Sequence, residues 1–194
     1  MKELSPLACA LFLALVGFQA EAQIVTNPLP GRVIVKLIPD YLRAVVYALN
    51  APNSTSPGTL LALNPTNGSV LNEITVGVNP TDMTVTPAGD SLYVINTGSR
   101  TISKVDLASF TVTSSQPITT PSTYSLSNPL YLTANNAGTI YITDGAWGPE
   151  IYQFTYTNDT EVMVLNTGGN QSSGAGGLVL SRDGSTLYIW QQYG

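Results

Sequence analysis

The residues best suited to chemistry are two carboxylates that flank an aromatic side chain. Asp144 and Glu150 lie three residues to either side of Trp147. Two carboxylates beside an indole are typical of sugar-binding and glycosidase sites, and carboxylate oxygens also bind divalent cations. The same segment can also be read as a turn at Asp144, a loop stiffened by Pro149 and a tryptophan packed between blades. We favour this structural interpretation.

Three further residues complete a tentative ligand-binding surface. Asp82 and Arg100 could form an ion pair between loops, which would add little to stability if exposed. Asn170 belongs to a glycine-rich run, residues 167–177, which lacks the lysine of a phosphate-binding loop and suits a flexible connection. The whole predicted set is Asp82, Arg100, Asp144, Trp147, Glu150 and Asn170.

Missing residue types exclude several kinds of active site. The sequence has no histidine and a single cysteine, Cys9. Catalysis by serine–histidine or cysteine–histidine pairs, histidine metal sites and haem attachment through a C-x-x-C-H motif are therefore excluded for this segment. We name no catalytic residue, metal ligand or cofactor, and further sequence beyond this segment could supply them.

The first 22 residues are typical of a secretory signal. Lys2 precedes an apolar run at residues 7–18, and Ala20-Glu21-Ala22 offers a cleavage site. The run is too short to span a membrane. We expect residues 23–194 to be the mature chain, without a membrane span, in the periplasm, at the cell surface or outside the cell. Its six basic and ten acidic residues are scattered, which makes nucleic acid an improbable partner.

A tyrosine within a short β-branched or aliphatic run recurs along the chain. The tyrosines are Tyr47, Tyr93, Tyr141 and Tyr188, at intervals of 46, 48 and 47 residues. A period of this length without helical periodicity is typical of β-propeller blades. One tyrosine per unit at one strand position indicates core packing rather than a ligand-stacking ladder.

Each unit contains four predicted strands, so the fold class is all-β. The strands are expected at residues 33–38, 45–49, 60–63 and 70–76; 83–86, 92–95, 102–107 and 111–113; 130–133, 140–143, 151–156 and 162–165; and 178–180 and 187–190. This gives about three and a half antiparallel four-stranded blades. Because a propeller closes with about four to eight blades, we expect a fragment of a larger ring. Closure by oligomerisation and a small four-bladed ring are the alternatives.

The second unit resembles the YVTN-type β-propeller repeat. It contains Val76-Gly77-Val78-Asn79-Pro80, the turn Thr86-Pro87-Ala88-Gly89, and Leu92-Tyr93-Val94-Ile95-Asn96. The third unit keeps Asn128-Pro129 and Ile140-Tyr141-Ile142 but has Asp144 where the family prefers asparagine. The resemblance implies an exported bacterial propeller, in a family whose members are mostly of unknown function.

Two functions remain open at this stage. The first is a non-enzymatic binding or surface-interaction module for an unknown protein or carbohydrate, which includes a purely structural repeat domain. The alternative is part of a lactonase- or hydrolase-like enzyme whose site is completed by missing blades. The sparse carboxylates and the absence of histidine favour binding. The fold alone permits either function, because propellers host unrelated activities and the site decides function.

Overall fold

The computed structural model describes residues 29–119, 126, 128–144, 150–156, 163–166 and 175–191, and all regular elements in these ranges are strands. In chain order they are β1 (Ile34–Asp40), β2 (Val45–Asn50), β3 (Pro57–Leu63), β4 (Val70–Val78), β5 (Pro80–Val85), β6 (Ser91–Asn96), β7 (Thr101–Asp106), β8 (Thr111–Pro117), β9 (Pro129–Ala134), β10 (Thr139–Asp144), β11 (Glu150–Thr155), β12 (Met163–Asn166), β13 (Ala175–Leu180) and β14 (Leu187–Gln191). The predicted signal, residues 1–22, lies outside the described residues.

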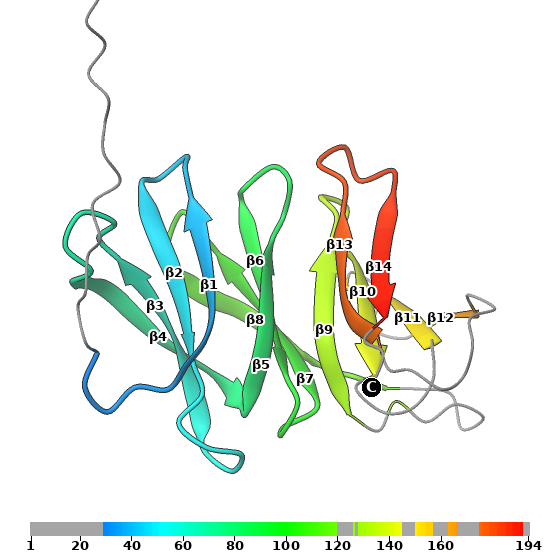
Figure 1. The fold of residues 1–194 in the computed structure, drawn as a ribbon, viewed down its shortest axis with the longest axis horizontal. Helices are drawn as coiled ribbons and strands as arrows, with labels where there is room; N and C mark the ends of the chain where they lie inside the picture. The colour runs from blue at the N-terminus through cyan, green and yellow to red at the C-terminus, as the bar shows by residue number, and fades with distance from the viewer. Residues whose placement is uncertain are drawn as a thin grey trace, which may run out of the picture.

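The strands form three four-stranded antiparallel sheets and one hairpin. Blade 1 has the order β1-β2-β3-β4, blade 2 β5-β6-β7-β8 and blade 3 β9-β10-β11-β12, while β13 pairs with β14 alone. The prediction of three complete blades and half of a fourth in a partial propeller is confirmed. Figure 1 shows the blades side by side, with the first strands of successive blades adjacent.

The first strands of successive blades contact one another, because β5 contacts both β1 and β9, and β9 contacts β13. The blades converge at these strands, which therefore lie next to the propeller axis. Consecutive antiparallel strands then place the turns after each second strand on the same side as the connections between blades. We call this side the loop face. Its described residues are 51–56, 79, 97–100, 118–119 and 128.

Tight turns join the first two strands of each blade on the opposite side. Gly89, Gly138 and Gly184 have φ values of 72°, 80° and 73°, in the left-handed region that glycine adopts without steric cost. The first blade is irregular, as the sequence indicated, and places Ala44 at a φ of 51°.

Apolar side chains from both faces of each middle strand build the core. In β6, Leu92 and Val94 pack with blade 1, whereas Tyr93 and Ile95 pack with blade 3. A strand buried on both faces needs a continuous apolar run, which explains why these strands lack polar alternation.

How deeply each repeated tyrosine is buried depends on the blade that follows it. Tyr47 and Tyr93 are buried, which confirms the prediction of core packing. Tyr141 is partly buried. For Tyr188 the prediction is wrong: this side chain is 57% exposed. The physical reason is that no sheet covers its face of the β13–β14 hairpin among the described residues.

Candidate functional site

Asp82 lies where the first strands of three blades meet, near the loop-face end of β5. Its Oδ1 forms a salt bridge of 2.9 Å with Lys36 Nζ of β1. Its Oδ2 accepts a 3.1 Å hydrogen bond from the backbone N–H of Leu132 in β9. The side chain of Asp82 is almost fully buried, whereas that of Lys36 is partly exposed. The carboxylate therefore links blade 2 to both neighbouring blades, and its ion pair is with Lys36 rather than with Arg100.

The pKa of Asp82 is raised above its ordinary value of 3.8. Burial is the main cause, because the charged form loses hydration. The hydrogen bond and charge of Lys36 lower the pKa, as does the N–H of Leu132, but they do not offset burial. Asp82 is thus a desolvated carboxylate, which is a feature of many functional sites and also of structural ion pairs.

Hydroxyl groups connect the loop face from blade 2 to blade 3. Thr81 Oγ1 and Thr97 Oγ1 lie 2.8 Å apart. Thr81 donates to the carbonyl of Leu130 at 3.2 Å, and Thr97 donates to the carbonyl of Pro129. These bonds fix the β6–β7 turn against the start of the next blade.

A second set of bonds fixes the same turn against blade 1. The N–H groups of Gly98 and Thr97 donate to the carbonyls of Val78 and Asn79, at 3.0 Å in both cases. The backbone N–H of Val78 donates to Ser99 Oγ at 3.2 Å. The turn at 97–100 is therefore bonded on both sides, and the surface it presents is preorganised.

In each complete blade, the last residue of the second strand is polar. Its side-chain oxygen accepts a hydrogen bond from a backbone N–H of the segment that precedes the blade. Asn50 Oδ1 accepts from the N–H of Val33 at 2.8 Å, and Asn96 Oδ1 accepts from Gly77 at 3.0 Å. Asp144 Oδ1 accepts from the N–H of Asn128 at 2.9 Å. The three positions are equivalent, so Asp144 has the same structural contact as the two asparagines.

The sequence carried a signal for this contact that our interpretation missed. Asn50, Asn96 and Asp144 each lie three residues after a repeated tyrosine. Residues of this kind at a fixed offset from a repeat indicate a backbone contact made once per blade. Asp144 read together with Glu150 suggested a carboxylate pair instead.

The remaining predicted site residues are placed only in part. Arg100 has a φ of 53° in the exposed β6–β7 turn, and its carbonyl accepts from the N–H of Ile118 at 2.8 Å. Glu150 begins β11, where its backbone pairs with Asn166. Trp147 and Asn170 lie outside the described residues. The structure thus places Asp82, Arg100 and Asp144 at the loop-face end of blades 2 and 3, and it gives separate backbone contacts to each.

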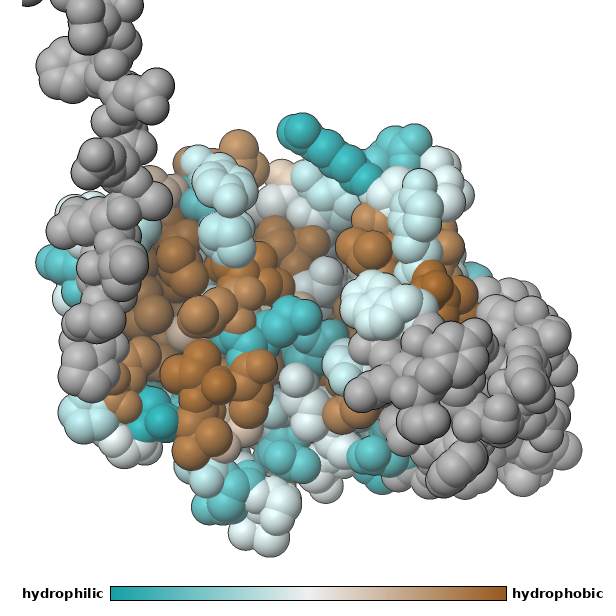
Figure 2. Space-filling view, viewed as in Figure 1, coloured by the Kyte–Doolittle hydropathy of each residue, from teal (hydrophilic) through white to brown (hydrophobic). Residues whose placement is uncertain are grey.

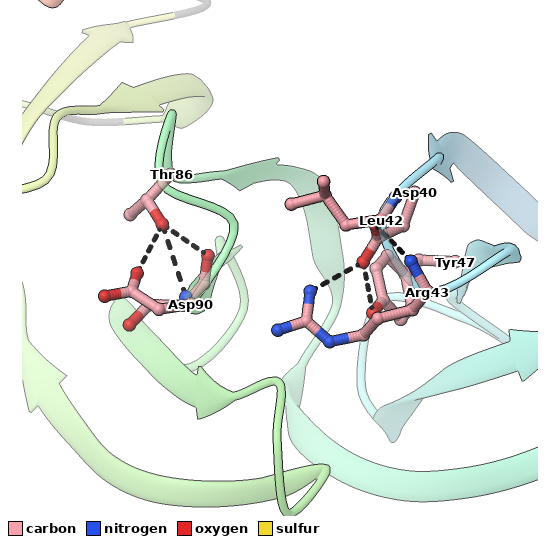
Figure 3. A network of polar contacts seen from close by, with 7 residues as sticks. Asp40, Leu42, Arg43, Tyr47, Thr86 and Asp90 are labelled. Carbon is pink, nitrogen blue, oxygen red and sulfur yellow. Dashed lines mark hydrogen bonds and ion pairs between the residues drawn. The ribbon is translucent and has the colours of Figure 1, made fainter.

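The opposite side of the disc carries another polar cluster, shown in Figure 3. Asp40 accepts hydrogen bonds from Tyr47 Oη and Arg43 Nη1, both at 2.9 Å. Burial raises the pKa of Asp40, but the bonds from Arg43 and Tyr47 outweigh it, so this pKa lies below its ordinary value. Thr86 and Asp90 form a similar contact of 2.7 Å in the next blade. Each contact closes the turn in which it lies and therefore accounts for these residues structurally.

Within the described ranges, no group of three or more Asp, Glu, His or Cys residues could hold an ion. In the same part of the chain, no helix is long and apolar enough to cross a membrane.

Solved structures share the fold of this chain. A Kuenenia stuttgartiensis hydrazine synthase structure matches with a TM-score of 0.61 and 20% identity over 89% of this chain and 45% of its own. The Swd1 β-propeller domain of Myceliophteria thermophila matches with a TM-score of 0.61 and 12% identity over 86% of this chain and 51% of its own. The WD40 repeats of RRP9 match with a TM-score of 0.56 and 13% identity over 80% of this chain and 44% of their own.

These matches establish the β-propeller fold alone, because identity is low throughout. The chain spans about half the length of the structures that it matches. No protein-family model matches the sequence, and no curated protein matches it. The YVTN-type assignment therefore remains a resemblance of the second repeat.

Proposed function

We propose that this chain is an exported propeller segment of the YVTN type that acts as a non-enzymatic binding module through its loop face. The ligand is a protein or a carbohydrate displayed on a surface. The observation that carries this proposal is the bonding of Asp82 and Asp144, the two predicted site carboxylates whose side chains the structure describes. Asp82 is committed to Lys36 and Leu132, and Asp144 to Asn128.

The shape of the loop face supports binding rather than turnover. The turn at 97–100 carries two exposed polar residues, Ser99 and Arg100. The bonds to both adjacent blades hold this turn in place, which lowers the entropic cost of binding. The described residues of the loop face are rich in hydroxyl and amide groups and include the cation Arg100, which suits the hydroxyl groups of a sugar or the carbonyls and carboxylates of a protein.

Direct binding tests this proposal. The purified chain is applied to a panel of immobilised polysaccharides and of envelope proteins from its source organism. Arg100→Asn is the test variant, because asparagine tolerates the positive φ of this position. Arg182→Asn is the matched control, since Arg182 lies in the exposed β13–β14 turn on the opposite side.

We expect at least one member of the panel to bind, with an affinity reduced about tenfold by Arg100→Asn and unchanged by Arg182→Asn. Equal loss in both variants would place binding elsewhere on the molecule. The enzyme alternative is tested on the same preparation with lactone and ester substrates. Hydrolysis that Asp82→Asn abolishes, while the fold is retained, would replace the binding proposal.

A further inference from the structure

The connection between β2 and β3, residues 51–56, contains an acceptor sequence for N-linked sugar. Asn53-Ser54-Thr55 has an asparagine, then a residue other than proline, then a threonine. In a secreted protein, the asparagine of such a sequence can carry a glycan. The pattern alone does not single out a site, because the chain is rich in serine, threonine and asparagine. It occurs four times, at Asn53, Asn67, Asn158 and Asn170.

The structure adds a specific geometry at Asn53, whose own side chain closes the turn. Asn53 Oδ1 accepts hydrogen bonds from the backbone N–H groups of Thr55 and Ser56, at 2.9 and 2.8 Å. Thr55 Oγ1 donates to the same oxygen at 3.1 Å. This arrangement is an Asx turn, in which the asparagine side chain takes the place of a backbone carbonyl. All three bonds end on Oδ1, and none of them uses Nδ2.

The acceptor sequence is accessible on the loop face. Asn53, Ser54 and Thr55 are all exposed. Figure 1 shows the β2–β3 connection protruding at the loop face, and Figure 2 shows hydrophilic to neutral residues where it protrudes. The corresponding turn of blade 2 is exposed at residues 98–100, although blade 2 lies between two described blades. Exposure is therefore a property of this turn position and does not depend on a missing neighbour.

The connection is also held in place. The backbone N–H of Asn79 donates to the carbonyl of Ser56 at 3.2 Å, and the carbonyl of Asn79 accepts from the N–H of Thr97 at 3.0 Å. Asn79 thus joins the β2–β3 connection to the β6–β7 turn. An exposed segment that is already fixed in a turn costs less entropy to bind than a mobile one.

We propose that Asn53 is a glycosylation site, at which Nδ2 carries the first sugar of a glycan. The proposal rests on the export of the chain, which is part of the proposed function, and not on what the loop face binds. The co-substrate is a sugar whose C1 is bonded to a phosphate. The bond from C1 to the phosphate oxygen breaks and a bond from C1 to Nδ2 forms. The amide gives one proton to a base of the transferase, and the phosphate leaves as an anion.

The hydrogen bonds at Oδ1 favour this reaction. An amide nitrogen is a poor nucleophile, because its lone pair is delocalised onto the carbonyl oxygen. As Nδ2 loses its proton, negative charge develops on Oδ1, to which two N–H groups and the Thr55 hydroxyl already donate. Donors that are in place before the reaction stabilise such charge. The hydroxyl at the third position of the acceptor sequence therefore has a chemical role.

The test is glycopeptide mapping of the full chain as its source organism secretes it. Mass spectrometry with electron-transfer fragmentation assigns the sugar to one residue. We expect a glycan on Asn53 in the wild type and in the matched control Ser54→Ala, which keeps the acceptor sequence. Asn53→Gln should eliminate it, and Thr55→Val should reduce it at least tenfold. Thr55→Ser, which keeps a hydroxyl, should retain it. These side chains are exposed, so folding should survive, and circular dichroism checks it.

Three results would count against the proposal, and the mass of the N-terminal peptide separates the first two. An unmodified Asn53 in a chain that lacks residues 1–22 would overturn the glycosylation site and leave export intact. An unmodified Asn53 in a chain that retains residues 1–22 would overturn both the site and the export on which it rests. A glycan on Asn53 that is unchanged by Thr55→Val would overturn the role of the hydroxyl.

Discussion

The salt bridge between Lys36 and Asp82 is expected to respond unequally to removal of its two partners. Lys36→Met leaves the Asp82 carboxylate buried, with the N–H of Leu132 as a remaining donor. Loss of one partner of a buried pair costs about 3–5 kcal/mol, because an uncompensated charge remains. Because the side chain of Lys36 is partly exposed, we expect the lower end of this range, about 3 kcal/mol, for Lys36→Met at neutral pH.

The reverse change should cost less. In Asp82→Asn, the amide oxygen still accepts from Leu132, and the side chain of Lys36 is 42% exposed, so its ammonium group can turn into water. We expect about 1 kcal/mol, the typical value of one hydrogen bond. In urea, with a slope of about 2 kcal/mol per molar, the midpoint should fall by about 1.5 M for Lys36→Met and about 0.5 M for Asp82→Asn.

The pH dependence follows from the raised pKa of Asp82. Because the folded-state pKa lies above the ordinary 3.8, the folded protein binds this proton more tightly than the unfolded chain does. Its contribution to stability is therefore complete below pH 3.8 and is lost as the pH rises through the folded-state pKa. Lys36→Met raises that pKa further, so the difference from wild type should be large at pH 7 and small near pH 4.

Urea titrations of both variants and of the double variant at pH 7 and pH 4 check this reasoning. With Asp82→Asn already present, Lys36→Met should cost less than about 1 kcal/mol. The reasoning would be refuted if Asp82→Asn were the more damaging change at pH 7, or if the cost of Lys36→Met did not depend on pH.

Three further predictions concern packing and titration. Leu132→Ala should lower the free energy of unfolding by about 3 kcal/mol in urea titrations, because Leu132 is 2% exposed. Leu37→Ala should cost less than about 1 kcal/mol, because Leu37 is 57% exposed, and similar costs would contradict this difference in burial. Gly77→Ala should cost about 1–3 kcal/mol and lower the melting temperature, because its Cβ would lie 2.5 Å from Asn96 Cγ; an unchanged melting temperature would contradict this close contact. In a carboxyl NMR titration, Asp183 should show a pKa of about 2. The side chain of Ser181 and then the backbone and side chain of Ser185 donate hydrogen bonds to this carboxylate and lower its pKa. A midpoint near 3.8 would rule these bonds out in solution.

Much of the fold could be predicted because the propeller repeat is local. The spacing of Tyr47, Tyr93 and Tyr141 and the turn glycines set the four-stranded unit, and the structure places Gly89, Gly138 and Gly184 at positive φ. Strand bounds differ by a few residues at most, chiefly where a strand extends into a connection, as in β8.

The candidate site was less predictable, because its partners come from different blades. Sequence spacing paired Asp82 with Arg100, whereas the structure gives it Lys36, which is 46 residues earlier in the chain and lies on the adjacent first strand. Asp144 was grouped with its neighbour Glu150, but its described contact is with Asn128, at the entry to the same blade. The contacts of these side chains depend on how the blades stack, which no short motif encodes.

The sequence by itself determined the repeat, the all-β class and the excluded chemistries, because these follow from residue types and from a period within one chain segment. Only the tertiary structure decided which equivalent residues are covered. Leu37 and Met83 occupy the same place in the repeat, as do Tyr188 and Tyr93, yet one of each pair is exposed and the other is buried. Burial in a propeller is a property of the contact between blades, and it differs between equivalent residues according to whether a described neighbouring blade covers them.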